Sequence, residues 1–318
     1  PGGLVLSTGG FFEIESAYFK GEPSLLSFKI APADENYAKK IADECGKEIK
    51  RLEGIFDASD PDSEIGRLNA AEKIAPVEVS EELAEALKTA AAVYYNSMGA
   101  FDPTMNPVKR VYAAAKAEGK DPDAEELKEA LQLCGFNKFA FKDKAASFLE
   151  PKMELDFEAL GRGLVVDKII AKLKEMGADE GYFSLGGQSA SFGKQTGKLR
   201  RIDAQSPAER GALYGYFEKA GQFKISAQGG KDGLRAFDSK TGKASPNGMT
   251  VITASFGDNL SNAALGAVAR AIAVMGPEKG LDFCKRFRCE AAIIYDDGTG
   301  SVKELKSAEL GYYFKKAQ

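Results

Sequence analysis

The chain has 318 residues, of which 44% are hydrophobic and 28% are charged, so it is long enough and apolar enough to bury a substantial core. Its net charge is −4 and its pI is near 5.4, and no basic stripe stands out, so we expect no nucleic-acid partner. No apolar run is long enough to span a bilayer, and we expect no transmembrane segment in this chain.

Helical and alternating apolar periods predict the secondary structure. Helices are predicted over 34–53, 80–96, 121–133, 158–176, 258–275 and 277–287, with Ser80 and Asp121 as the N-caps of the second and third. Strands are predicted as a hairpin within 4–30 and over 139–155, 180–192, 200–204, 214–218, 223–226, 249–255 and 291–295. Because strands and helices do not alternate strictly, the pattern favours an α+β fold. No Pro/Ser-rich linker divides the chain, so a single domain over 1–318 is expected.

The cysteines do not indicate a metal or redox site. The chain has four of them, with no Cys-x-x-Cys spacing, and it has no histidine to complete a zinc site. Cys45 shares a helical stripe with Ile41 and Ile49, which predicts a buried free thiol.

Five short segments carry the most specific signal in the chain. They are Asp62–Asn69 (DSEIGRLN), Gly99–Thr104 (GAFDPT), Leu155–Asp167, Gly186-Gly187 and Asp238–Gly242 (DSKTG). In this order they resemble the signature segments of the ApbE family of flavin transferases, and the matches run from about Ile55 to Gly276. The resemblance implies mixed, mostly antiparallel sheets with packed helices.

Members of this family bind FAD and, with Mg²⁺, transfer its FMN half to a Thr or Ser hydroxyl of an acceptor protein. FAD, Mg²⁺ and an acceptor protein are therefore the partners that the resemblance implies. Family members are often exported lipoproteins, so a periplasmic or membrane-anchored location is expected, with a cytoplasmic one left open. The chain begins with Pro1 rather than Met, so it does not reveal whether an export signal precedes it.

The resemblance also implies a set of FAD-binding residues. These are Asn69, Asp102, Thr104, Gly161, Arg162, Gly163, Gly186 and Gly187. Glycines would let backbone N–H groups approach the phosphates, and Arg162 stands where the family has Lys. If the resemblance is set aside, the residue types alone indicate a turn at Asp102 and Thr104 and a loop at Asn69. The glycines then indicate ordinary turns.

The family's metal site consists of an Asp, a Thr four residues later and a main-chain carbonyl. Here Asp258, Asn262 and the carbonyl of Gly161 match, and a spacing of four puts both side chains on one helix face. Counting back from Gly276 instead places Gly266 and Arg270 at the ligand positions and abolishes the site. The first register is preferred because it keeps Asp, Leu and Ala together. Without the family, Asp258 reads as a helix N-cap.

The family's histidine is missing, and its position falls near Arg235, which cannot accept a proton. Three hypotheses follow. The chain is an FMN transferase that uses another base, such as Asp238 or Asp232, or a flavin-binding protein without transfer activity. Alternatively, it is a Mg²⁺-dependent FAD pyrophosphatase that releases FMN and AMP. Arg235 and Asp238 are the catalytic candidates.

Overall fold

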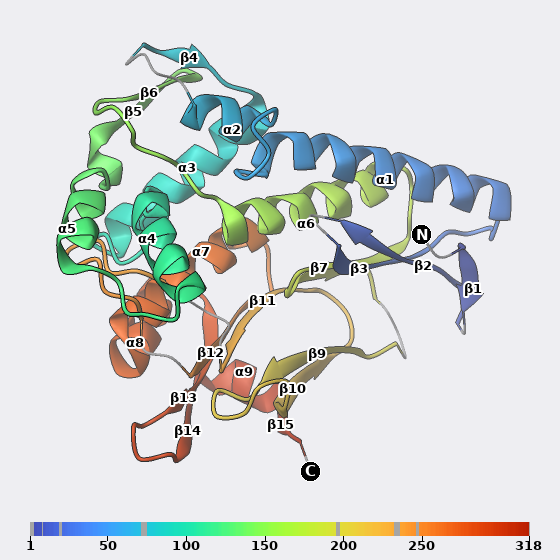
Figure 1. Ribbon diagram of the computed structural model, residues 1–318. Coiled ribbons are helices and arrows are strands. Elements are labelled where there is room, and N and C mark those ends of the chain that lie inside the picture. The colour runs from blue at the N-terminus through green and yellow to red at the C-terminus, as the bar shows by residue number, and fades with distance from the viewer. Residues whose placement is uncertain are drawn as a thin grey trace.

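The computed structural model describes residues 3–7, 9–18, 21–70, 75–194, 198–231, 236–245 and 248–317. Its centre is a nine-stranded sheet with the order β1-β2-β3-β7-β8-β11-β12-β13-β14, in which every neighbouring pair is antiparallel (Figure 1). The strands are β1 Val5–Ser7, β2 Phe11–Tyr18, β3 Glu22–Lys29, β7 Glu180–Leu185, β8 Gln188–Phe192, β11 Phe223–Gly230, β12 Met249–Ser255, β13 Glu290–Asp296 and β14 Val302–Lys306. The predicted α+β class with mostly antiparallel sheets is confirmed.

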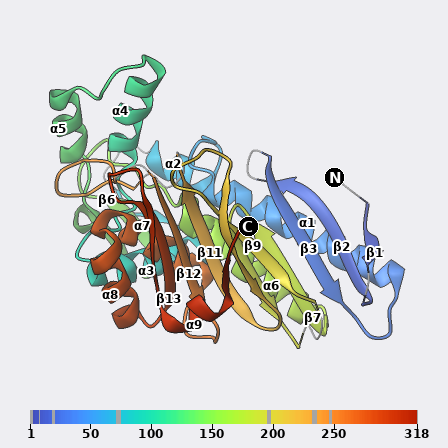
Figure 2. The same ribbon diagram turned by 90° about the horizontal axis from the view of Figure 1, so that it is seen from below.

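Helices cover one face of this sheet and a smaller sheet covers the other (Figures 1 and 2). On the helical side, α6 (Glu158–Glu175) and α7 (Asn262–Met275) lie on the strands, and α1 (Glu35–Phe56), α3 (Glu81–Asn96) and α8 (Pro277–Phe287) pack around them. On the other side lie α9 (Ala308–Tyr313) and a sheet of β9 (Arg200–Gln205), β10 (Leu213–Lys219) and β15 (Phe314–Lys316).

Strand β13 shows that the central sheet is buried on both faces. Ala291 and Ile293 join the core under the helices, whereas Ala292 and Ile294 join the core under the small sheet. Successive side chains of a strand point to opposite faces, so a sheet covered on both faces needs apolar residues at every position. This explains why β13 contains the continuous apolar run 291–294.

The remaining elements form the end of the molecule that carries the Gly99–Thr104 segment. They are α2 (Glu64–Asn69), α4 (Asn106–Ala117), α5 (Ala124–Gln132), the short 3₁₀ helix Phe136–Lys138 and a sheet of β4 (Val77–Glu78), β5 (Phe139–Lys142) and β6 (Ala145–Phe148). In Figure 2 the α4–α5 pair stands out from the rest of the molecule. Helices α2, α4 and α9 were not predicted.

Capping residues explain most helix starts. Ser80 caps α3 as predicted, with its side chain accepting the N–H of Leu83. Two predicted starts are wrong: α5 is capped by Asp123 rather than Asp121, and α7 is capped by Ser261 rather than Asp258. In each case a cap closer to the first helical turn takes the free N–H groups.

No helix in the described ranges is both long and apolar enough to cross a membrane. All four cysteines are free and buried, which confirms the prediction for Cys45. Burial raises the pKa of the Cys45 and Cys134 thiols to about 12, so neither is a thiolate at neutral pH.

Candidate functional site

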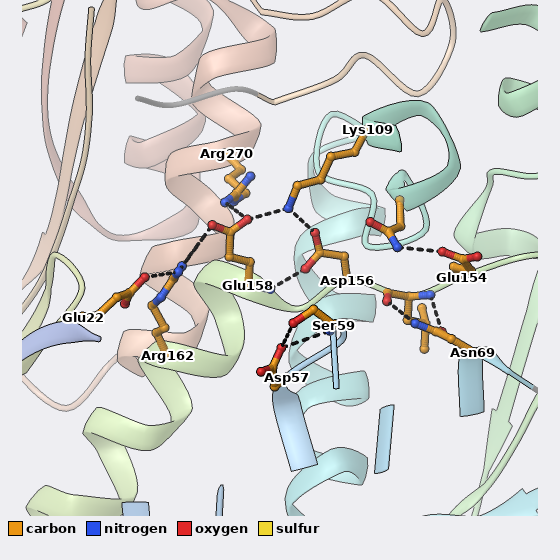
Figure 3. A network of polar contacts seen from close by, with 12 residues as sticks. Glu22, Asp57, Ser59, Asn69, Lys109, Glu154, Asp156, Glu158, Arg162 and Arg270 are labelled. Atoms are coloured by element: carbon orange, nitrogen blue, oxygen red, sulfur yellow. Dashed lines mark hydrogen bonds and ion pairs between the residues drawn. The ribbon is translucent and has the colours of Figure 1, made fainter. Parts of the chain in front are cut away.

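Glu158, the first residue of α6, lies at the centre of a charged cluster (Figure 3). Lys109 from α4 places its Nζ 2.8 Å from Glu158 Oε2, and Arg270 from α7 places its Nη2 3.2 Å from the same oxygen. Arg162, one turn along α6, places its Nη1 3.3 Å from Glu158 Oε1. Three helices thus bring three cations to one carboxylate.

Two more carboxylates complete the cluster. Asp156 Oδ2 lies 2.8 Å from Lys109 Nζ, and its Oδ1 accepts the N–H of Glu158 at 2.9 Å. Glu22, the first residue of β3, forms an ion pair with Arg162. The cluster therefore holds three cations and three carboxylates.

The charges in this cluster reinforce one another. Burial alone would raise the pKa of Glu158, but Arg270, Lys109 and Arg162 outweigh burial and hold that pKa far below its usual range. Burial would likewise lower the pKa of Lys109, but Asp156 and Glu158 keep it above its ordinary value. At neutral pH Glu158 is ionised and Lys109 is charged, so Glu158 is a poor proton acceptor.

Three pockets meet at Glu158. The first, of about 590 Å³, lies between the end of α1, α4 and α6 and is also lined by Lys109 and Arg162. The second, of about 300 Å³, is lined by Gly186-Gly187 and Arg270. The third is a narrow space of about 50 Å³ that reaches Asp102. Asp102, Arg162, Gly186 and Gly187 therefore line pockets that share Glu158 as part of their walls, and we call these three pockets together the cleft.

Asn69 lies beside this cleft and orients its wall. Its side-chain Nδ2 donates to the carbonyl of Leu155, and its Oδ1 accepts the N–H of Leu155, both at 2.8 Å. This pair of hydrogen bonds ties α2 to the residue just before Asp156. The structure thus gives Asn69 a positioning role, and a direct contact with FAD stays a prediction.

Asp102 and Thr104 also hold the backbone in place. Asp102 Oδ1 accepts from the N–H and the hydroxyl of Thr104, at 2.8 and 2.6 Å, and its Oδ2 accepts the N–H of Phe136 at 3.2 Å. Thr104 Oγ1 accepts the N–H of Gly135 at 2.7 Å. Burial raises the pKa of Asp102, although these hydrogen bonds oppose the shift. The pair fixes the turn that forms one wall of the narrow pocket.

The glycines of the motifs serve close packing. A Cβ at Gly163 would lie 2.5 Å from the backbone of Ala263, so this glycine lets α6 and α7 touch. A Cβ at Gly161 would lie 3.0 Å from Phe56 Cβ. Gly186 and Gly187 have φ of 53° and 79° and make the two-residue turn between β7 and β8, where a Cβ on Gly186 would strike Glu22 and Arg162.

The structure separates the two side chains that were predicted to bind Mg²⁺. Asp258 precedes α7, and its side chain is 80% exposed. Asn262 is the first residue of α7 and is fully buried, with its Nδ2 donating to the carbonyls of Ser189 and Ile225. The prediction that both lie on one helix face is wrong, because α7 begins only at Asn262.

The alternative register agrees with the geometry instead. Gly266 lies against the carbonyl of Ala159 and the side chain of Gln188, and Arg270 pairs with Glu158. Both positions therefore face the N-terminus of α6 and the cleft. Neither a glycine nor an arginine side chain can supply an oxygen ligand.

The residues at this site do not fit a magnesium ion. Mg²⁺ prefers oxygen ligands, but within the described ranges no group of three or more His, Cys, Asp or Glu side chains is arranged to hold a metal. The one central carboxylate, Glu158, already has three cations within 3.3 Å, and these would repel a dication.

Of the two catalytic candidates, Asp238 lies within the described residues and Arg235 does not. Arg235, like Asp232, lies outside the described residues. Asp238 lines a separate groove of about 730 Å³, together with Gly99 and Ser239. Its Oδ1 accepts the N–H groups of Lys240 and Thr241, at 2.7 and 3.3 Å, so it stabilises its own loop. A catalytic role for Asp238 stays a prediction.

Sequence reasoning did not identify Glu158, Lys109 or Glu22 as site residues, and it considered Arg270 only in the alternative register, which abolishes the metal site. Glu22, Lys109 and Arg270 lie far apart in the chain and outside the five motif segments. Glu158 alone among these four residues belongs to such a segment, Leu155–Asp167. Single charged residues in helices and strands are ordinary in a sequence, so no local signal marked them.

Comparisons with known proteins identify the family to which the chain belongs. A model of the ApbE family matches residues 24–294. The chain is 25% identical over 289 residues to the FAD:protein FMN transferase of Haemophilus influenzae, covering 85% of this chain and 83% of that protein. It is 26% identical over 222 residues to the FAD:protein FMN transferase of Klebsiella pneumoniae, covering 65% and 68%.

Solved structures share the fold at low sequence identity. The flavin transferase ApbE of Vibrio cholerae is 20% identical with a TM-score of 0.79, covering 95% of this chain and 99% of that chain. The flavinyl transferase ApbE of Pseudomonas stutzeri, in its apo form, is 18% identical with a TM-score of 0.80, covering 95% and 96%.

Proposed function

This chain belongs to the ApbE family, and from that premise we propose that it binds FAD in the cleft around Glu158. One observation carries the proposal. The family match extends over 24–294, and residues from three segments that resemble family signatures, Asp102, Arg162 and Gly186-Gly187, line pockets that meet at one charged cluster. Paired cations beside a glycine turn suit the diphosphate bridge of a dinucleotide.

In FMN transfer an acceptor hydroxyl oxygen attacks the phosphorus on the FMN side of the diphosphate. The new bond is a phosphoester, the bond from that phosphorus to the AMP oxygen breaks, and AMP leaves with its electron pair. The hydroxyl proton must pass to a base. Charge on the phosphates is neutralised by neighbouring cations, here those around Glu158.

We propose that this transfer to a Thr or Ser of an acceptor protein is slow in this chain. Glu158 is ionised but held by three cations, and Asp238 Oδ1 is occupied by its own loop. The chain has no histidine. General-base help is worth about 10²–10⁴-fold, so its loss leaves FAD binding intact while turnover falls. A flavin-binding protein that does not transfer FMN is the second candidate, supported by the same observations.

Magnesium dependence, which the resemblance implies, is not part of this proposal, because the donor set does not fit the ion. Equilibrium titration of FAD, followed by flavin fluorescence, tests binding. Absence of FAD binding in every buffer would disprove the proposed function. Incubation with an acceptor protein then distinguishes the activities: protein-bound flavin with AMP indicates transfer, and free FMN with AMP indicates a pyrophosphatase.

A further inference from the structure

In the alternative register, Arg270 occupies a position at which the family has a metal ligand. The neighbouring ligand position, Gly266, has no room for a carboxylate, because even a Cβ there would lie 2.8 Å from the carbonyl oxygen of Ala159 and 2.8 Å from Gln188 Nε2. Arg270 instead projects to the cleft, with its guanidinium 3.2 Å from Glu158 (Figure 3). A fixed positive charge thus stands near the start of α6.

Arg162 brings a second guanidinium to the same pocket. Figure 3 shows it between Glu22 and Glu158, on the side of Glu158 away from Lys109. Its Nε and one oxygen of Glu22 are buried and have no hydrogen-bond partner among the described residues, and the same holds for Oε1 of Gln188. All three residues line the pocket beside Gly186-Gly187. Of these three atoms only Arg162 Nε can donate to a phosphate oxygen, because the oxygens of Glu22 and Gln188 accept hydrogen bonds.

Glu158 imitates an anionic ligand in this cluster. Its two oxygens take contacts from Lys109, Arg162 and Arg270, as the oxygens of a phosphate would. Its side chain is 36% exposed, so it can turn into solvent when a stronger anion arrives. The three cations would then keep a partner, and the site would not be left with unpaired buried charge.

We propose that Arg162, Arg270 and Lys109 bind the diphosphate bridge of FAD without a divalent cation, and that the diphosphate replaces Glu158 as their common partner. The inference rests on the proposed FAD binding and adds to it the way in which the phosphates are held. Guanidinium groups bind phosphate oxygens in a bidentate manner and stay charged at any physiological pH, so they supply the positive charge that a metal would otherwise provide.

The first experiment compares FAD affinity in excess EDTA with that in excess MgCl₂, using flavin fluorescence on the full chain. Equal affinities, within about twofold, are expected. FAD binding that requires Mg²⁺ would overturn the inference and leave the proposed function standing.

The second experiment uses variants. Arg270→Gln is expected to weaken FAD binding in EDTA by about 10–100-fold, the range for a lost charged hydrogen bond. Glu158→Gln removes the competing carboxylate and is expected to tighten FAD binding. The matched control is Arg201→Gln on β9, where Arg201 pairs with Asp203 (2.7 Å) and lines none of the three pockets that meet at Glu158; it should leave affinity unchanged. Unaltered affinity in Arg270→Gln would overturn the proposal.

A third experiment separates the metal-free phosphate site from the proposed binding of FAD. Inorganic pyrophosphate, titrated by calorimetry in EDTA, carries the phosphates without the flavin. Pyrophosphate binding that is lost in Arg270→Gln would support the metal-free site even if FAD does not bind, in which case only the proposed function fails. If neither FAD nor pyrophosphate binds in EDTA, the inference is wrong. Thermal unfolding of each variant shows whether it is folded.

Discussion

Asp167, in the middle of α6, accepts the N–H of Asn262, the first residue of α7. The distance from Asp167 Oδ1 to Asn262 N is 3.0 Å, and Oδ2 lies 3.2 Å from the N–H nitrogen of Ala263. A carboxylate from one helix thereby caps the next, satisfying N–H groups that have no partner within α7. This contact fixes where α7 starts and so places Arg270 two turns later in the cleft.

The first prediction concerns the pH dependence of this cap. Burial raises the pKa of Asp167 to about 6, although the hydrogen bonds from Asn262 and Ala263 oppose the shift. The unfolded value is about 3.9. Between pH 4 and pH 6 the folded state then binds more protons than the unfolded state, so this group contributes stability at low pH that is lost as pH rises through about 6.

Asp167→Asn removes that titration. We expect the stability of the parent relative to the variant to fall by roughly 2–3 kcal/mol between pH 4 and pH 7. Urea unfolding of both proteins across this range is the measurement. A difference that stays constant with pH would show that Asp167 does not titrate in this window.

The second prediction concerns the crossing of α6 and α7. Gly163→Ala would push a methyl group to 2.5 Å from the backbone of Ala263, so the helices must move apart. We expect a loss of about 2–4 kcal/mol in unfolding free energy, by overpacking. Gly54→Ala in α1 is the control, because a Cβ there meets nothing within 4 Å and alanine favours the helix. Equal stabilities of the two variants would contradict this account.

The third prediction concerns Asn69. Asn69→Ala removes both hydrogen bonds to Leu155, and the buried N–H and carbonyl of Leu155 lose these partners. We expect a destabilisation of about 1–3 kcal/mol and weaker FAD binding, because Asp156 and Lys109 shift together. Asn96→Ala, which removes an exposed hydrogen bond to Ala92, should cost less than about 0.5 kcal/mol. Denaturant titration and FAD fluorescence report the two effects.

The fourth prediction contrasts Asp258 with Asn262. Asp258→Ala removes an exposed side chain, and we expect stability to stay within about 0.5 kcal/mol and FAD affinity to be unchanged. Asn262→Ala removes two buried hydrogen bonds to Ser189 and Ile225 and should cost about 2–3 kcal/mol. A large loss of FAD affinity in Asp258→Ala, with stability intact, would revive the metal register that the structure contradicts.

Local patterns in the sequence predicted much of the secondary structure. The cap at Ser80 and the glycine turn at Gly186-Gly187 depend on neighbours within a few residues, so short-range chemistry is enough to recognise them. The same holds for the motif segments that carried the family resemblance. Short helices such as α2 and α9 escaped prediction, because six residues carry too little periodicity.

Only the tertiary structure decided the register of α7 and the composition of the cleft. The start of α7 depends on Asp167, 95 residues earlier, and Arg270 meets Glu158 only because Gly163 and Gly266 let two helices approach. The charge cluster joins α4, α6, α7 and β3, and such contacts leave no trace in any local window. By itself the sequence determined the family and the fold class, whereas long-range packing determined which charges face the ligand.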